Sequence, residues 1–84
     1  MATVNVTPQA ADQFDFLPRP IQTRILHLFE RLRDWPEVSG AKSLRGKLAG
    51  SYRIRTGDYR LQFHVDAQTV IVDKIGHRDR FYEE

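Results

Sequence analysis

Apolar and polar residues alternate with two different periods along the chain, and the change of period divides it into elements. Val4 and Val6 alternate with polar residues over positions 3–7, which predicts a short strand. From Pro8 to Trp35 the apolar residues recur every three or four positions, which predicts amphipathic helices. Prolines in the segment 18–20 interrupt this pattern, so we expect two helices joined by a short turn, a helical hairpin.

After a loop over residues 36–50, the apolar residues recur at every second position. This period predicts two strands that begin near residues 51 and 59 and are joined by a tight turn at Gly57 and Asp58. A third strand follows a turn at 66–68. Its residues 70–72 are all apolar, which suits a more central strand covered on both faces.

The expected order of elements is therefore βααβββ, in a single domain that covers residues 1–84. The last three strands form an antiparallel meander, and the first strand joins the same sheet. The helical hairpin packs on one face to bury its apolar stripe. The predicted fold class is α+β, with a small antiparallel-type sheet.

The composition narrows the class of protein. With no cysteine, the chain forms neither disulfides nor thiolate metal sites. It has no apolar run of the roughly 18 residues that a membrane span needs, and its N-terminus lacks the pattern of a signal peptide. We therefore expect a cytoplasmic protein that binds no membrane. Because the acidic residues are scattered, we expect neither a metal site nor a cofactor.

Positive charge is concentrated in one stretch of a chain whose net charge is only +2. Residues 1–41 carry four arginines against five acidic residues. Residues 42–60 carry a single acidic residue, Asp58, and six cations: Lys42, Arg45, Lys47, Arg53, Arg55 and Arg60. A basic block on a nearly neutral chain indicates an anionic partner such as a phosphate backbone. The alternative is a solvated charged face.

Four segments, taken in order, resemble the RelE/ParE superfamily of toxins from bacterial and archaeal type II toxin–antitoxin systems. They are Lys42–Gly46, Gly50–Arg55, Gly57–Leu61, and Ile75–Arg78 followed by Phe81 and Tyr82. The resemblance covers nearly the whole chain. Each segment alone is a weak signal, and the four together on the same order of elements are a strong one.

The resemblance implies a fold and two alternative activities. Members of the RelE branch are endoribonucleases (mRNA interferases) that cut mRNA on the ribosome, without a metal, by attack of a 2′-hydroxyl on the adjacent phosphate. Members of the ParE branch inhibit DNA gyrase and do not cut RNA. Toxins of both branches are normally neutralised by a cognate antitoxin protein. We expect the RelE activity, since a cluster of arginine, histidine and tyrosine has no evident purpose in a gyrase inhibitor.

Arginines are the expected phosphate ligands of such a site. Arg60 and Arg78 match two arginines that the RelE branch places around the scissile phosphate, where a guanidinium fits phosphate oxygens in two-point fashion. Arg53 and Arg55 occupy positions that are lysines in the best-known RelE toxins. Because a guanidinium keeps its proton near neutral pH, these two suit RNA binding rather than proton transfer. A weakened relative that binds without much cleavage is therefore a third possibility.

Proton transfer is then expected from His77 and Tyr82. An imidazole exchanges protons near neutral pH, and a phenol can stack on an unpaired base or take part in proton transfer. The alternatives are that His77, at the end of the sheet, packs against the core or caps a carbonyl, and that Tyr82 closes the core. His64 shares the predicted face of Arg60 and is assigned to RNA binding. The same role, on ribosomal RNA backbone, is assigned to Lys42, Arg45 and Lys47.

Overall fold

The computed structural model describes residues 1–81, with the backbone alone for residues 80 and 81. Its elements are β1 (Thr3–Val6), α1 (Pro8–Asp15), α2 (Arg19–Leu32), β2 (Lys42–Ser43), a 3-10 turn η1 (Gly46–Leu48), β3 (Ser51–Thr56), β4 (Tyr59–Asp66), β5 (Thr69–His77) and α3 (Arg78–Phe81). The predicted βααβββ order is confirmed, with two short elements added inside the predicted loop.

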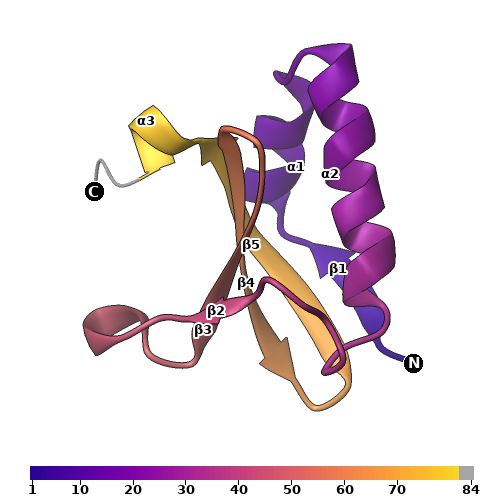
Figure 1. Ribbon diagram of the computed structural model, residues 1–84, viewed down its shortest axis with the longest axis vertical. Helices are drawn as coiled ribbons and strands as arrows, with labels where there is room; N and C mark the ends of the chain where they lie inside the picture. The colour runs from indigo at the N-terminus through magenta and orange to yellow at the C-terminus, as the bar shows by residue number, and fades with distance from the viewer. Residues whose placement is uncertain (82–84) are drawn as a thin grey trace.

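The strands form one mixed sheet in the order β1-β5-β4-β3-β2 (Figure 1). The last three strands are an antiparallel meander, as predicted, and β2 adds to its edge in the same sense. In contrast, β1 runs parallel to β5, from Thr3 opposite Thr69 to Val6 opposite Val72. A parallel neighbour needs a long crossover, and the two helices and three strands between β1 and β5 supply it.

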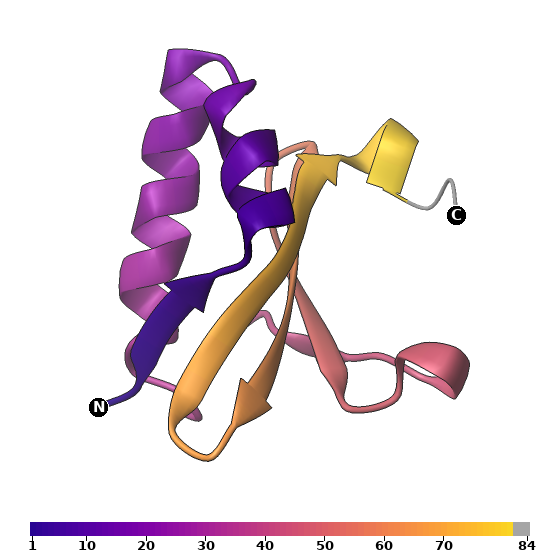
Figure 2. The ribbon, with the colours of Figure 1, turned by 180° about the vertical axis from the view of Figure 1, so that it is seen from behind.

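Both long helices lie on one face of the sheet, as the apolar stripe predicts (Figures 1 and 2). Helix α1 begins where expected, since the Thr7 hydroxyl accepts a hydrogen bond from the Ala10 amide at 3.2 Å. Helix α2 buries Ile25, Leu28 and Leu32. The core between the layers is completed by the sheet residues Ile54, Leu61, Phe63, Val70, Val72 and Ile75. No helix in residues 1–81 is both long and apolar enough to cross a membrane.

The two predictions for the apolar strand at 70–72 have different outcomes. The strand β5 lies inside the sheet, between β1 and β4, as its sequence predicts. The two long helices cover only one of its faces, where Val70 and Val72 are buried. Ile71 points to the other face and is half-buried. The face away from α1 and α2, called the open face below, is therefore available to position functional side chains.

Candidate functional site

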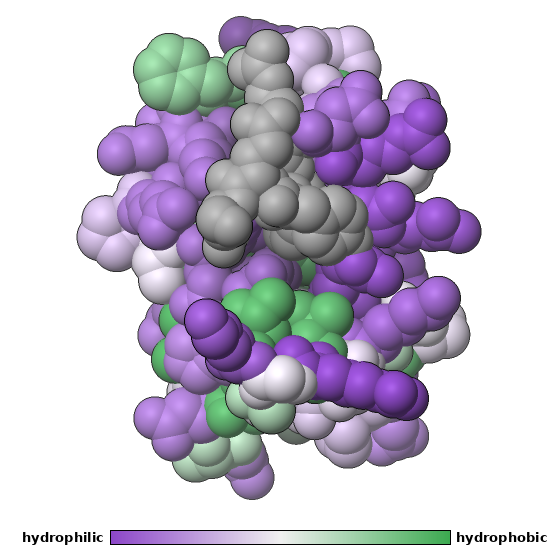
Figure 3. Space-filling model, turned by 90° about the vertical axis from the view of Figure 1, so that its left-hand side faces the viewer, coloured by the Kyte–Doolittle hydropathy of each residue, from purple (hydrophilic) through white to green (hydrophobic). Residues whose placement is uncertain are grey.

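The open face carries rows of polar side chains that run across four strands. On β4, Leu61 and Phe63 are buried beneath the helices, so Arg60, Gln62 and His64 point to the open face. Residues opposite each other on paired strands share a face. One row is thereby fixed by the register as Lys42, Arg53, Gln62 and Lys74, and a second row as Arg55, Arg60 and Gly76. Figure 3, which views this side of the molecule, shows hydrophilic residues around a small hydrophobic area.

A bulge in β5 places two further polar residues side by side on the open face. Phe63 lies opposite Val72 and Gln62 lies opposite Lys74, so Asp73 is an extra residue in the strand. Strict alternation from the buried Val72 would have directed Lys74 towards the helices. Asp73 would lie on the open face in a regular strand as well, so the bulge changes the direction of Lys74 alone, and nothing in the residue pattern marks it. Burial lowers the pKa of the Lys74 ammonium.

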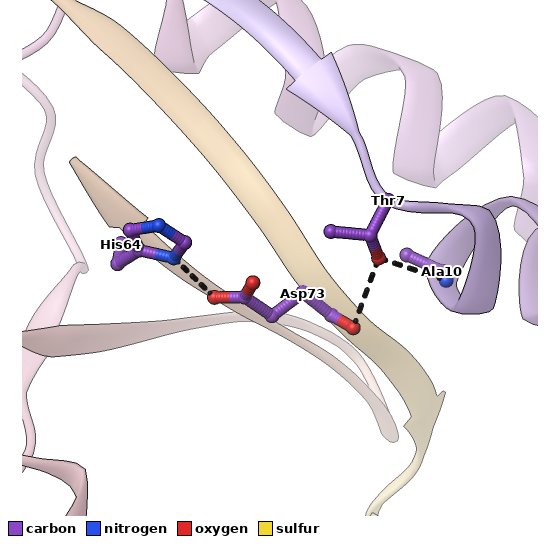
Figure 4. Close-up of polar contacts among 4 residues, drawn as sticks. All are labelled: Thr7, Ala10, His64 and Asp73. Atoms are coloured by element: carbon purple, nitrogen blue, oxygen red, sulfur yellow. Dashed lines mark hydrogen bonds and ion pairs between the residues drawn. The ribbon is translucent and has the colours of Figure 1, made fainter. Parts of the chain in front are cut away.

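Asp73 pairs with His64 on the open face. The carboxylate Oδ2 of Asp73 lies 2.6 Å from Nδ1 of His64, with side chains that are 29% and 40% exposed (Figure 4). The backbone carbonyl of Asp73 also accepts a hydrogen bond from the Thr7 hydroxyl at 3.4 Å. Because Thr7 caps α1, the bulged residue is tied to the start of that helix. The backbone of Asp73 is thus anchored at the start of α1, while its carboxylate contacts the imidazole.

Arg60 lies within a group of arginines, as the sequence analysis predicted. Partial burial, followed by the positive charges of Arg53, Arg55 and Arg78, lowers the pKa of the Arg60 guanidinium, and Asp58 opposes this shift. Like charges lower the pKa of a cation because they disfavour its charged form. Arg60 therefore lies in the positive field of three other arginines, which is the electrostatic setting that a phosphate site requires.

Arg78 lies at the end of β5 and is held against the turn between β3 and β4. Its amide donates to the Asp58 carbonyl at 2.8 Å, and its Nε lies 3.8 Å from Oδ1 of Asp58 and 3.7 Å from Oδ1 of Asp79. The structure thus brings Arg78 into the electrostatic surroundings of Arg60 with its side chain more than half exposed.

His77 lies on the other side of the sheet from Arg60. It is paired with Tyr59, and the two rings pack edge to face with centroids 5.1 Å apart, whereas Arg60 is paired with Gly76. Its Nδ1 accepts the Asp79 amide at 3.1 Å. The structure therefore separates His77 from the row of arginines and packs its ring against Tyr59. Tyr82 lies outside the described residues.

The remaining predicted RNA ligands divide between the sheet and the basic loop. Lys42 extends the row that contains Arg53, while Arg45 and Lys47 are exposed at and beside η1. The segment with η1 projects from the body of the molecule (Figures 1 and 2). Within residues 1–81, no three His, Asp or Glu side chains gather in a way that suits a metal ion.

Comparisons with known proteins indicate both the fold and the family. Residues 4–82 match the family model described as the ParE toxin of type II toxin–antitoxin systems. A search of curated proteins found no match.

Solved toxin–antitoxin structures share the fold. A chain of the RelBE2 toxin–antitoxin complex from Mycobacterium tuberculosis has a TM-score of 0.81 and 29% identity, with 92% of this chain and 98% of that chain covered. A chain of the RelB–RelE complex from Methanococcus jannaschii has a TM-score of 0.78 and 23% identity, with 94% and 95% covered. The isolated RelE toxin of E. coli has a TM-score of 0.78 and 20% identity, with 98% and 89% covered.

Proposed function

Because the chain belongs to the family of ParE toxins of type II toxin–antitoxin systems, we propose that its toxic activity is cleavage of mRNA on the ribosome. The protein is then an endoribonuclease of RelE type, working in the cytoplasm, where ribosomes are found. We favour RNA cleavage over gyrase inhibition because of the cations on the open face. Its cationic rows are what a phosphate backbone requires, and they are carried by the sheet rather than by a flexible tail.

The observation that best supports RNA cleavage is the position of Arg60 in the electrostatic field of Arg53, Arg55 and Arg78. Attack of a 2′-hydroxyl on the adjacent phosphate adds negative charge to the phosphate oxygens in the transition state. Fixed cations stabilise that charge without having to reorganise during the reaction. Arg60, with Arg53 and Arg55 from the adjacent strand, provides such cations on one surface, so the chemistry needs no metal.

A cognate antitoxin is the second partner that we propose. The similar structures from M. tuberculosis and M. jannaschii are complexes of a toxin with its antitoxin. An acidic segment would be attracted to the open face and would compete there with RNA. Such a partner would block cleavage by covering the cationic rows or the edge of the sheet.

Programmed ribosomes provide the direct test. The wild-type protein is incubated with ribosomes that hold mRNAs offering all codons in the A site, and the ends of the fragments are mapped. We expect fragments with a 2′,3′-cyclic phosphate and a 5′-hydroxyl. The Arg60→Ala variant should be slower by about 100-fold or more, and Arg19→Ala, at the start of α2, should match the wild type. Intact mRNA at every codon would refute the proposal.

Inhibition of DNA gyrase is the second candidate, and the match to a ParE toxin model favours it. It predicts that the protein inhibits supercoiling by gyrase at micromolar concentration, with Arg60→Ala as active as the wild type. Supercoiling assays with the same set of variants decide between the two activities. If Arg60→Ala and Arg19→Ala both still inhibit gyrase and the mRNA stays intact, the chain belongs to the gyrase branch.

A further inference from the structure

We propose that His64 and Asp73 form the proton-transfer pair of this site, with His64 as the catalytic base and Asp73 as the residue that positions it. The inference rests on the proposed RNA cleavage and names the group that removes the 2′ proton. Neither residue was expected to do so from the sequence, where His64 was assigned to RNA binding and Asp73 to no role.

The register of the sheet places His64 beside the cations that would hold the phosphate. Gln62 lies at the centre of the open face, with Arg53 opposite it on β3 and Lys74 opposite it on β5. Arg60 and His64 are each two residues from Gln62 along β4, a distance of about 7 Å. A phosphate above Gln62 is therefore within reach of three cations and of the imidazole.

The contact with Asp73 determines which nitrogen of His64 is free to react. An ionised carboxylate only accepts hydrogen bonds, so the contact of 2.6 Å assigns the proton of the neutral ring to Nδ1. The lone pair is then on Nε2. The same arrangement orients the histidine of a Ser-His-Asp triad and stabilises the imidazolium that forms. Asp73 can act in this way because the bulge and its bond to Thr7 hold it in place.

The reaction balances with these groups. The 2′ oxygen bonds to phosphorus as Nε2 of His64 takes its proton, and the bond from phosphorus to the 5′ oxygen breaks. The departing 5′ oxygen takes a proton from water, and the imidazolium later returns one to water. The products are a 2′,3′-cyclic phosphate and a 5′-hydroxyl.

Other candidates for the base are less well placed in the described residues. The arginines hold their protons too tightly. His77 lies on the other side of the sheet, and its Nδ1 already accepts the Asp79 amide. The charged residues that face His64 come from β2 to β5, and they are Lys42, Arg53, Asp66, Asp73 and Lys74. Burial lowers the pKa of Lys74, so the variants at His64, and not the pH profile alone, assign a change in rate near neutrality to the imidazole.

Single-turnover cleavage on programmed ribosomes, measured from pH 5.5 to 8.5, tests the inference. We expect a rate for the wild type that rises with pH and then levels. His64→Gln should lose about 100-fold or more together with the rising limb, and so should His64→Asn. Asp73→Asn should be slower by about 10-fold or more, because an amide neither fixes the proton on Nδ1 nor stabilises the imidazolium. His27→Gln, an exposed helix residue, is the matched control and should follow the wild type.

Four measurements separate a chemical role from a structural one. Ribosome binding and thermal unfolding should be nearly unchanged in the His64 variants, and added imidazole should restore part of the cleavage by His64→Gly. A substrate with sulfur in place of the 5′ oxygen, a better leaving group, should not rescue His64→Gln, because a base acts at the other oxygen.

The outcomes distinguish this inference from the proposed function. An inactive wild type would refute RNA cleavage as a whole. An active wild type whose rate and pH profile are shared by His64→Gln would refute only the proton-transfer pair. Full rescue of His64→Gln by the sulfur substrate would also overturn it, because His64 would then act as the acid.

Discussion

At the scale of single residues, the open face combines arginines from β3 with a lysine from β5. Arg53 and Arg55 supply permanent charge on β3, while Lys74 reaches the same row from β5. Burial lowers the pKa of Lys74, so its charged form costs folding free energy. A partly buried cation that destabilises the fold is understandable if it is retained for binding an anion.

The cost of Lys74 gives a prediction for stability. With the folded pKa below the unfolded value of about 10.4, the unfolded chain binds more protons, so stability rises as pH passes from the lowered pKa to 10.4. At any pH below the lowered pKa the cost is present in full. We therefore expect Lys74→Met to raise the urea midpoint at pH 7, and the advantage to shrink by pH 10. A midpoint that falls, or an advantage independent of pH, would contradict this account of Lys74.

At the scale of elements, what could be predicted depended on whether the signal was local. The turn at Gly57 and Asp58 and the apolar stripe of α2 are local signals, and the elements they predict are present. The parallel pairing of β1 depends on partners in β5 that are more than 60 residues away in the sequence. The bulge at Asp73 depends on a register shift between β4 and β5. His77 was expected to transfer protons at the site of Arg60, but the pleat of the sheet places the two residues on opposite faces.

The junction of β1, α1 and β5 gives a prediction at this scale. Thr7 caps α1 and also donates to the Asp73 carbonyl, so one hydroxyl links the helix to the bulge. We expect Thr7→Ala to lower the free energy of unfolding by about 1 kcal/mol, and Thr7→Ser to restore most of it. If Asp73 positions His64, Thr7→Ala should also slow cleavage more than ribosome binding. Equal unfolding free energies for the Ala and Ser variants would contradict the role of the cap.

At the scale of the whole molecule, the positive charge is divided between the cationic rows of the sheet and the basic loop around η1. The rows belong to rigid strands, as a site for chemistry requires. The loop carries Arg45 and Lys47 on exposed positions beside η1, with Lys42 at the edge of the sheet. This division predicts that the loop contributes affinity for RNA backbone and the sheet contributes the chemical step.

Salt dependence tests that division. Each phosphate neutralised on single-stranded RNA contributes about 0.7 to the slope of log affinity against log salt. Changing Arg45 and Lys47 together to glutamine should therefore reduce the slope for ribosome binding by about 1.4, while single-turnover cleavage at saturating protein stays within a few-fold of the wild type. The matched control changes two arginines of the helical hairpin, Arg19 and Arg24, which are exposed in α2. An unchanged slope in the loop variant, or an equal loss in the control, would show that the basic loop does not bind the phosphate backbone.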